Sequence, residues 1–269
     1  MENADYAKPP PALESLYAIL KRLRAPNGCP WDREQTRETL ARCLAEECAE
    51  LLEAIDHNDP PAICDELGDL LMNVAFQAVV AEERGEFTLT DVLAGIDAKM
   101  IRRHAHIFGD ETAETASDVV AVWEKIKARE ANRPKRESLM DGVPAEMSAL
   151  NRAEKLQKRA AKVGFDWSES GQILDKIREE LDELRAAAAE GDDRHIEEEI
   201  GDLLFAVANY SRFRKGRTAE ELLRAANDKF ARSFRYVEAQ LKAAGIPLES
   251  AGIDRMEALW QEAKRRPEA

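Results

Sequence analysis

The sequence predicts an all-α protein made of two tandem repeated helical-bundle domains. Alanine, leucine, glutamate and arginine are abundant, whereas aromatic residues make up only 6% of the chain. Runs of β-branched residues, which favour strands, are almost absent. An acidic pattern also occurs twice, which favours two related domains over one in a chain of 269 residues.

Residues 131–147 have the composition of a linker between the two domains. This segment contains Pro134 and ends with the turn-forming sequence Asp141-Gly142-Val143-Pro144. The expected organisation is an N-terminal helical domain over residues 1–130, a linker over residues 131–147, and a C-terminal helical domain over residues 148–269.

Apolar residues at helical spacing and capping residues delimit the expected helices. In the first half they are residues 13–24, a helical hairpin that includes residues 44–71, and residues 90–104 and 117–130. In the second half they are residues 145–163, 172–190, 193–212, 219–243 and 253–264. Residues 25–36 are expected to form a loop, in which Trp31 either stacks on a base or fills the edge of the core.

The hairpin in the first half carries two pairs of acids, Glu47 with Glu50 and Glu66 with Asp69. Residues three apart lie on one face of a helix, so each pair places two carboxylates side by side. Asp59 can cap the second helix, since the prolines that follow it suit a first turn. An antiparallel pair of helices would bring all four acids together.

Such a cluster of negative charges needs a cation to offset the repulsion between them. Two unit charges about 6 Å apart repel by roughly 3 kcal/mol at an effective dielectric constant near 20. Hard divalent cations with oxygen ligands are the natural partners, Mg²⁺ above all, with Mn²⁺ as a possible substitute. The alternative is a set of solvated surface acids, because the chain contains 53 acidic residues.

The repeat favours the metal site over the surface alternative. All four acids recur at one constant offset in the second half, as Glu180, Glu183, Glu199 and Asp202. A glycine precedes the last acid in both copies, Gly68 and Gly201. Glycine inside a helix costs about 1 kcal/mol relative to alanine, so its recurrence predicts a close helix approach there.

Basic and aromatic residues follow each acidic hairpin in the same order. In the first half they are Lys99, Arg102, Arg103, Trp123 and Lys127, and in the second half Lys229, Arg232, Trp260 and Lys264. Each could belong to a solvated helix face. Their recurrence instead favours binding of a phosphate ligand. A nucleoside triphosphate fits a site that combines a metal ion, basic side chains and a tryptophan.

Composition and missing motifs exclude several other classes. A net charge of −14 opposes general binding to nucleic acids or anionic membranes, and no apolar run approaches the ~18 residues of a membrane span. The N-terminus does not resemble a signal peptide, and Cys29, Cys43, Cys48 and Cys64 form no Cys-x-x-Cys motif, so a cytoplasmic location is expected. The sequence gives no support for a phosphate-binding P-loop, for the Glu-x-x-His motif of di-iron bundles or for a Ser-His-Asp set.

The combined motifs resemble those of the tandem-domain MazG family of nucleoside triphosphate pyrophosphohydrolases. In the first half these motifs are Cys29-Pro30-Trp31-Asp32, the two acid pairs, Arg102-Arg103-His104 and Trp123-Glu124-x-Ile126-Lys127. In the second half they are Gly164-Phe165-Asp166-Trp167, Glu199-Ile200-Gly201-Asp202 and Asn227-x-Lys229-Phe230. The resemblance covers roughly residues 15–265.

The resemblance implies a homodimer of helical bundles that cleaves nucleoside triphosphates to monophosphate and pyrophosphate with Mg²⁺, in a house-cleaning role. It also implies that the second domain is the main catalytic one. There Glu180, Glu183, Glu199 and Asp202 would hold metal and activate water, and Lys229, Arg232, Trp260 and Lys264 would bind substrate. Ser233 departs from the pattern, since the family often has a second arginine there.

The role of the first domain stays open from the sequence. Its four acids would also hold metal, so it could be a second active site, a regulatory nucleotide site or a dimerisation module. A rival for the whole chain is a non-enzymatic helical protein that binds nucleotide or a partner for regulation.

Overall fold

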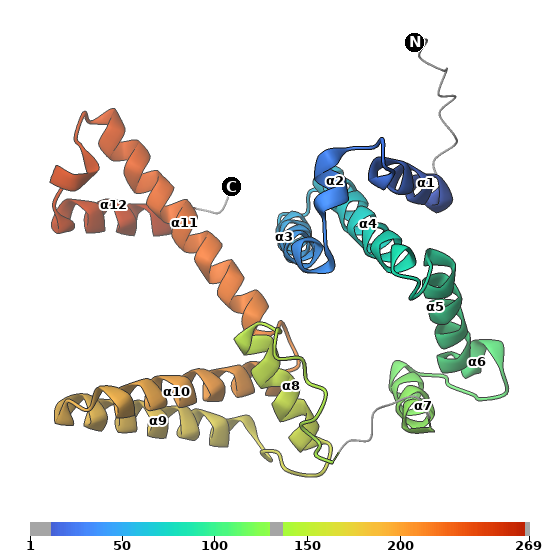
Figure 1. Ribbon diagram of the computed structural model, residues 1–269. Coiled ribbons are helices and arrows are strands. Elements are labelled where there is room, and N and C mark those ends of the chain that lie inside the picture. The colour runs from blue at the N-terminus through green and yellow to red at the C-terminus, as the bar shows by residue number, and fades with distance from the viewer. Residues whose placement is uncertain (1–11, 130–136, 267–269) are drawn as a thin grey trace. The chain divides into compact units, whose positions relative to one another are not determined.

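A computed structural model describes residues 12–129 and 137–266 of the chain. It divides into two compact units, unit 1 (Met1–Arg133) and unit 2 (Pro134–Ala269). The described residues form helices joined by turns and loops, without strands (Figure 1). The predicted all-α class is therefore confirmed. Within these residues, every helix is too short or too polar to cross a membrane.

Unit 1 is a bundle built around one long antiparallel hairpin. Its helices are α1 (Leu13–Arg24), α2 (Pro30–Glu34), α3 (Arg37–Asp56), α4 (Pro60–Glu83), α5 (Leu89–Arg103), α6 (Ala105–Phe108) and α7 (Ala116–Arg129). Helices α3 and α4 form the hairpin, α1 packs on α4, and α7 packs on α5. The expected loop at residues 25–36 thus contains the short helix α2.

Local capping explains where the hairpin begins and turns. Thr36 accepts a hydrogen bond from the backbone N–H of Thr39 and starts α3. Asp59 accepts one from the backbone N–H of Ala62, with prolines in the first turn of α4, so the predicted cap is confirmed. Both caps are interactions within three residues, and the one at Asp59 was predicted from the sequence.

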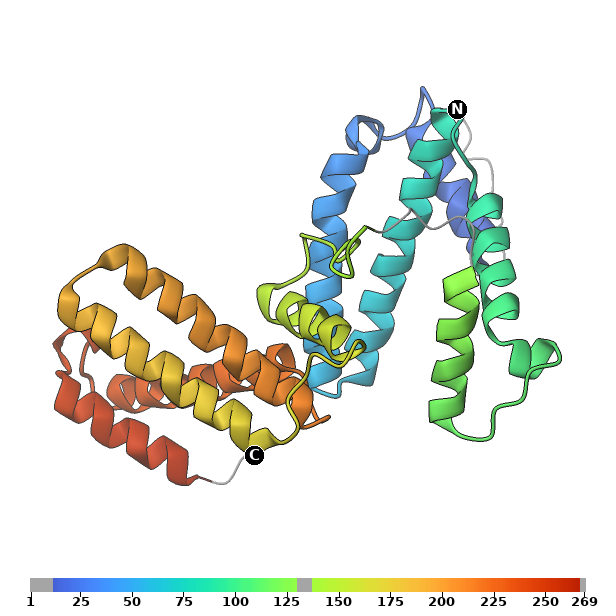
Figure 2. The same ribbon diagram turned by 90° about the horizontal axis from the view of Figure 1, so that it is seen from below.

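Unit 2 repeats this arrangement. Its helices are α8 (Ala149–Ala161), α9 (Ser170–Glu190), α10 (Asp193–Phe213), α11 (Ala219–Ala243), the short 3₁₀ helix η1 (Leu248–Ser250) and α12 (Ile253–Arg265). Helices α9 and α10 form the antiparallel hairpin, which is seen side by side in yellow and orange in Figure 2. Helix α8 packs on α10 as α1 packs on α4, and α12 packs on α11.

The turn between α9 and α10 has the residues that its geometry requires. Gly191 ends α9 with φ of 75°, a left-handed conformation that glycine adopts without a steric penalty. Asp192 then caps α10 by accepting hydrogen bonds from the backbone N–H groups of Arg194 and His195. Both features lie at the break that was expected between the helices over residues 172–190 and 193–212.

The predicted linker is partly a component of unit 2. Of residues 131–147, those up to 136 lie outside the described residues. In the remainder, the carbonyls of Leu139, Asp141 and Gly142 all accept hydrogen bonds from the guanidinium of Arg159 in α8. Helix α8 begins only at Ala149, rather than at Ala145 as expected, and the segment before it is held to α8 by these contacts.

The expected close helix approach at the two glycines is wrong, and one of the two alternatives for Trp31 is excluded. A Cβ added at Gly68 or Gly201 would meet no atom within 4 Å, so neither glycine marks a close helix approach within the chain. Trp31 is 61% exposed and does not fill the edge of the core. The apolar side chains of Leu67 and Leu71 are exposed on α4.

Candidate active site

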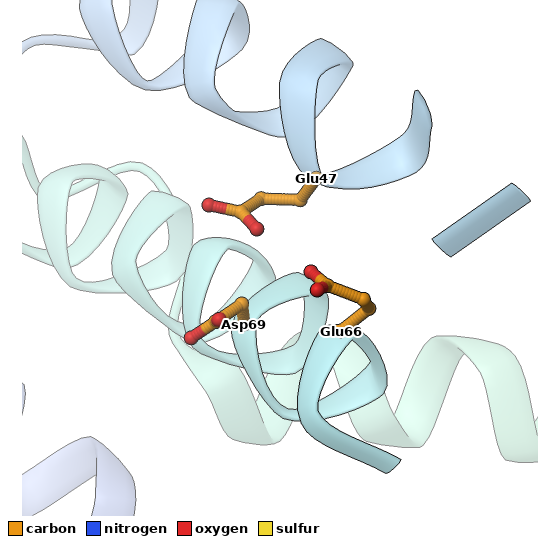
Figure 3. A group of neighbouring side chains, drawn as sticks. All are labelled: Glu47, Glu66 and Asp69. Atoms are coloured by element: carbon orange, nitrogen blue, oxygen red, sulfur yellow. The ribbon is translucent and has the colours of Figure 1, made fainter. Parts of the chain in front are cut away.

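The acids of unit 1 meet between the two helices of the hairpin. Glu47 comes from α3, and Glu66 and Asp69 come from α4 (Figure 3). One carboxylate oxygen from each of the three lies within 4.8 Å of the others. Glu50, the fourth predicted member, lies outside this group of three.

Unit 2 has the same arrangement. Glu180 of α9 and Glu199 and Asp202 of α10 bring carboxylate oxygens within 4.8 Å of one another. Glu183 lies outside the group, one turn after Glu180 on α9. The hairpin therefore brings together three of the four predicted acids in each unit. The i, i+3 spacing places the two acids of the second helix side by side, whereas the later acid of the first helix lies outside the group.

Three of these acids have a raised pKa, in each case first through burial and then through the charges of neighbouring acids. Burial, followed by the charges of Glu199 and Glu180, raises the pKa of Glu183. In unit 1, burial raises the pKa of Glu47 and of Glu66, and the charges of neighbouring acids add to it. Each site thus concentrates negative charge that its protein surroundings do not fully neutralise.

One buried oxygen in each group lacks a hydrogen-bond partner. These are Oε2 of Glu66 in unit 1 and Oε2 of Glu199 in unit 2. The other oxygen of Glu199 faces Nε2 of His195 at 3.0 Å. A buried carboxylate oxygen without a partner is costly, and three converging carboxylates are a donor set that a hard divalent cation fits. The residues present therefore fit the expected metal.

The two sites differ in the side chain beside the acids. In unit 2, Nζ of Lys176 lies 2.7 Å from a carboxylate oxygen of Glu180 and 2.7 Å from one of Glu179. These contacts raise the pKa of Lys176, so it stays charged. Cys43 stands at the equivalent position of unit 1, by the same offset that relates Glu47 to Glu180, and supplies no charge.

A cavity of about 520 Å³ opens next to the acids of unit 2. Glu180, Asp202 and Lys176 lie on its edge, and much of its wall is apolar. The walls come from α8, α9, α10 and the loop that carries Phe165 and Trp167. Its volume lies in the range typical of small-molecule sites.

The basic and aromatic residues expected to bind substrate lie elsewhere in unit 2. Trp260 and Lys264 are on α12, where Nζ of Lys264 is 5.7 Å from the ring centroid of Trp260. Lys229 and Arg232 are on α11. None of the four lines the cavity, which is instead lined by the cations Lys176 and Arg212.

The equivalent residues of unit 1 also form a separate group. Nζ of Lys127 lies 5.9 Å from the ring centroid of Trp123 on α7. Lys99, Arg102 and Arg103 are on α5. Their role in substrate binding stays a prediction.

Comparison with known proteins gives the family. The sequence model of the MazG nucleotide pyrophosphohydrolase domain matches residues 35–108 and 169–236, which contain both acidic hairpins. Nucleoside triphosphate pyrophosphohydrolase of Escherichia coli (strain K12) is 45% identical over 94% of this chain and 97% of its own length. Nucleoside triphosphate pyrophosphohydrolase/pyrophosphatase MazG of Thermotoga maritima is 42% identical over 93% and 95%. Protein YabN of Bacillus subtilis is 46% identical over 92% of this chain, although the match covers 50% of that protein.

These matches define the class as tandem all-α nucleotide pyrophosphohydrolases. Both copies of the domain are present, and two relatives are covered almost from end to end. The chain belongs to the MazG family, and the resemblance drawn from its motifs is confirmed.

Proposed function

We propose that this chain hydrolyses nucleoside triphosphates to nucleoside monophosphate and pyrophosphate, with Mg²⁺ held by the carboxylates of unit 2. The main support is the group of Glu180, Glu199 and Asp202, which has a buried oxygen without a partner and lies beside a cavity of ligand size. The relatives named as nucleoside triphosphate pyrophosphohydrolases support the same reaction.

In the proposed reaction, water attacks the α-phosphorus and the bond from that phosphorus to the oxygen that bridges to the β-phosphorus breaks. The carboxylates of Glu180, Glu183, Glu199 and Asp202 would hold the cation, and one of them would take up the proton that the water loses. A bound divalent cation neutralises phosphate charge and activates the water. Lys176, charged and next to Glu180, is in position to offset further negative charge.

The direct test uses purified protein, Mg²⁺ and each of several nucleoside triphosphates. We expect monophosphate and pyrophosphate in equal amounts, and no reaction after the metal is chelated, with Mn²⁺ able to restore it. Formation of diphosphate and orthophosphate would contradict the reaction that we propose.

The proposal includes a homodimer that works in the cytoplasm on the nucleotide pool. A stripe of apolar residues on α10 supports the dimer, because Ile200, Leu204 and Val207 share one face and are 44%, 53% and 45% exposed. Four unpaired cysteines suit a reducing compartment. Nucleic acids and membranes are not proposed as partners of a chain with net charge −14.

The rival hypothesis is a non-enzymatic regulatory protein. Family membership and the names of the relatives favour the enzyme. In the assay above, metal-dependent nucleotide binding without turnover would support the rival.

A further inference from the structure

The cavity of unit 2 has a set of polar groups that the proposed chemistry does not use. Gln157 lies on α8, and Asn209 and Arg212 lie on α10. Gln157 is 7% exposed, and its Nε2 donates a hydrogen bond to the carbonyl of Phe205 at 2.9 Å. Its Oε1 is buried and has no hydrogen-bond partner.

Arg212 fixes the position of Asn209 within this set of polar groups. Its guanidinium pairs with the carboxylate of Asp166, and both Nε and a terminal nitrogen donate to Oδ1 of Asn209 at 2.9 and 2.7 Å. The pairing lowers the pKa of Asp166, so the pair stays ionised. Because Oδ1 of Asn209 is held by Arg212, the amide presents its N–H donors as the remaining hydrogen-bonding group.

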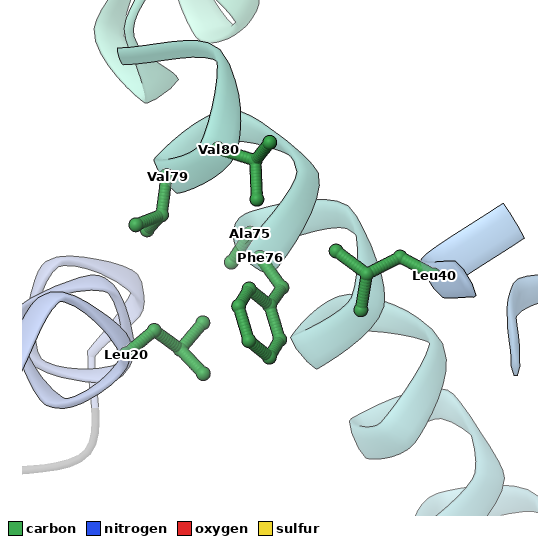
Figure 4. Close-up of a cluster of buried hydrophobic side chains, with 6 residues drawn as sticks. All are labelled: Leu20, Leu40, Ala75, Phe76, Val79 and Val80. Carbon is green, nitrogen blue, oxygen red and sulfur yellow. The ribbon is translucent and has the colours of Figure 1, made fainter. Parts of the chain in front are cut away.

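The same place in unit 1 is a packed apolar core. At the offset that relates the two acid groups, Phe76 and Val79 take the positions of Asn209 and Arg212. Leu20 of α1 corresponds to Gln157 of α8, since each is followed by a lysine and an arginine and each helix packs on the second helix of its hairpin. These three residues belong to one buried cluster together with Leu40 (Figure 4).

The two units also differ here in the size of the side chains. Ala160 and Ala206 line the cavity of unit 2. Their counterparts in unit 1 are Leu23, which packs against the apolar cluster, and Asn73, which is 1% exposed. Larger side chains thus fill the space in unit 1 that is open in unit 2.

The polar set is not required for the helices to pack. Unit 1 shows that the three equivalent helices can be held together by an apolar cluster, whereas a buried acceptor without a partner destabilises the fold. A costly set of groups around an open cavity indicates a ligand that satisfies them. The ligand must have a flat or apolar body for the walls, hydrogen-bonding edges, and a phosphate end toward Glu180 and Asp202.

We propose that this cavity takes the nucleoside of the substrate, and that Gln157 and Asn209 determine base specificity. Oε1 of Gln157 accepts from a base N–H, and the amide of Asn209 donates to a base acceptor. In unit 1, Phe76 and its neighbours close the equivalent space, so that unit can hold a cation but no nucleoside. This inference rests on the proposed function. It predicts that each chain binds one nucleotide, although it contains two groups of converging acids.

The test is calorimetric titration of the full chain with Mg²⁺ and a nucleoside triphosphate analogue whose α–β bridge cannot be hydrolysed. We expect one analogue bound per chain. Asn209→Phe, which copies unit 1, should weaken binding by more than about tenfold, because the larger ring occupies space that the nucleoside would take. Titration with Mn²⁺ alone should give the wild-type metal affinity, which shows that the variant is folded and its carboxylates intact.

Two further variants complete the design. Gln157→Leu, which copies Leu20, should reduce the differences in kcat/KM among the four common bases. Phe76→Leu, the control in unit 1, should leave both the affinity and the number of bound analogues unchanged. Two analogues per wild-type chain, or unchanged affinity in Asn209→Phe, would overturn the inference.

The outcomes separate this inference from the proposed function. If the chain yields monophosphate and pyrophosphate while Asn209→Phe keeps its affinity, the reaction stands and the nucleoside site is wrong. If the wild type binds one analogue and Asn209→Phe loses it, but the products are diphosphate and orthophosphate, the site stands and the reaction is wrong.

Discussion

At the residue scale, identical acids have different surroundings in the two units. Glu180 is 6% exposed and is paired with Lys176, whereas Cys43 replaces that lysine beside Glu47. The acids of unit 2 also border an open cavity, and the equivalent space of unit 1 contains Phe76. The two groups of acids therefore need not have the same role, because a reaction also requires space for the substrate.

Single substitutions of equivalent acids test this difference. Glu183→Ala should lower nucleotide hydrolysis by at least about 100-fold, more than the loss typical of residues that only support metal ligands. Glu50→Ala, its counterpart in unit 1, should lower it by no more than a few-fold. Both rates are measured as pyrophosphate release at saturating Mg²⁺, and equal losses would contradict the assignment of chemistry to unit 2.

At the element scale, capping residues set the geometry that places the acids. Asp59 and Asp192 start the second helix of each hairpin, and Gly191 ends the first helix of unit 2. These are interactions within three or four residues, so the sequence alone predicts where the helices of each hairpin meet. The start of α8 was mispredicted, and the preceding segment is held by Arg159 through contacts 17 to 20 residues distant in sequence.

Substitution of two glycines, one within α9 and one directly after it, should change the free energy of unfolding in opposite directions. Gly191→Ala should lower the free energy of unfolding by about 1 kcal/mol, since a left-handed φ of 75° strains a residue with a Cβ. Gly171→Ala should raise it by up to about 1 kcal/mol, because alanine favours a helix and its Cβ would meet open space. Urea denaturation measures both, and a stabilising Gly191→Ala would contradict the capping role.

At the scale of the whole molecule, both units repeat an exposed apolar stripe. Leu67, Leu71 and Val74 on α4 are the counterparts, at the repeat offset, of the stripe on α10, and they are 50%, 45% and 42% exposed. Chance exposure would not preserve this stripe in both copies. A second copy of the chain is the partner that we propose for it.

The dimer can be tested by a charge placed on the stripe. We expect Leu204→Glu to convert a dimer to a monomer, because it puts a carboxylate into an apolar interface. Ile253→Glu is the matched control, since Ile253 is 74% exposed at the start of α12, away from the stripe, and should leave the dimer intact. Light scattering coupled to gel filtration gives the mass, and a monomeric wild type would contradict the proposal.

Much of the candidate site could be predicted from the sequence. The positions of Glu47, Glu66 and Asp69, and of their counterparts, follow from helix periodicity and one turn. Lys176 and Asn209 carry a signal that a comparison of the two halves would have revealed, since the first half has Cys43 and Phe76 there. The repeat reveals the residues that the two halves share, whereas the functional difference lies in the residues that differ between them.

The sequence by itself determined the helical class, the repeat and the acid groups, because each depends on spacings of a few residues along one helix or one hairpin. Only the tertiary structure decided which unit has an open cavity. That outcome depends on side chains far apart in the chain, such as Gln157 and Asn209, whose combined volume and polarity leave space in unit 2. Leu20 and Phe76 fill the same space in unit 1, because a packed interior depends on how remote side chains fit together.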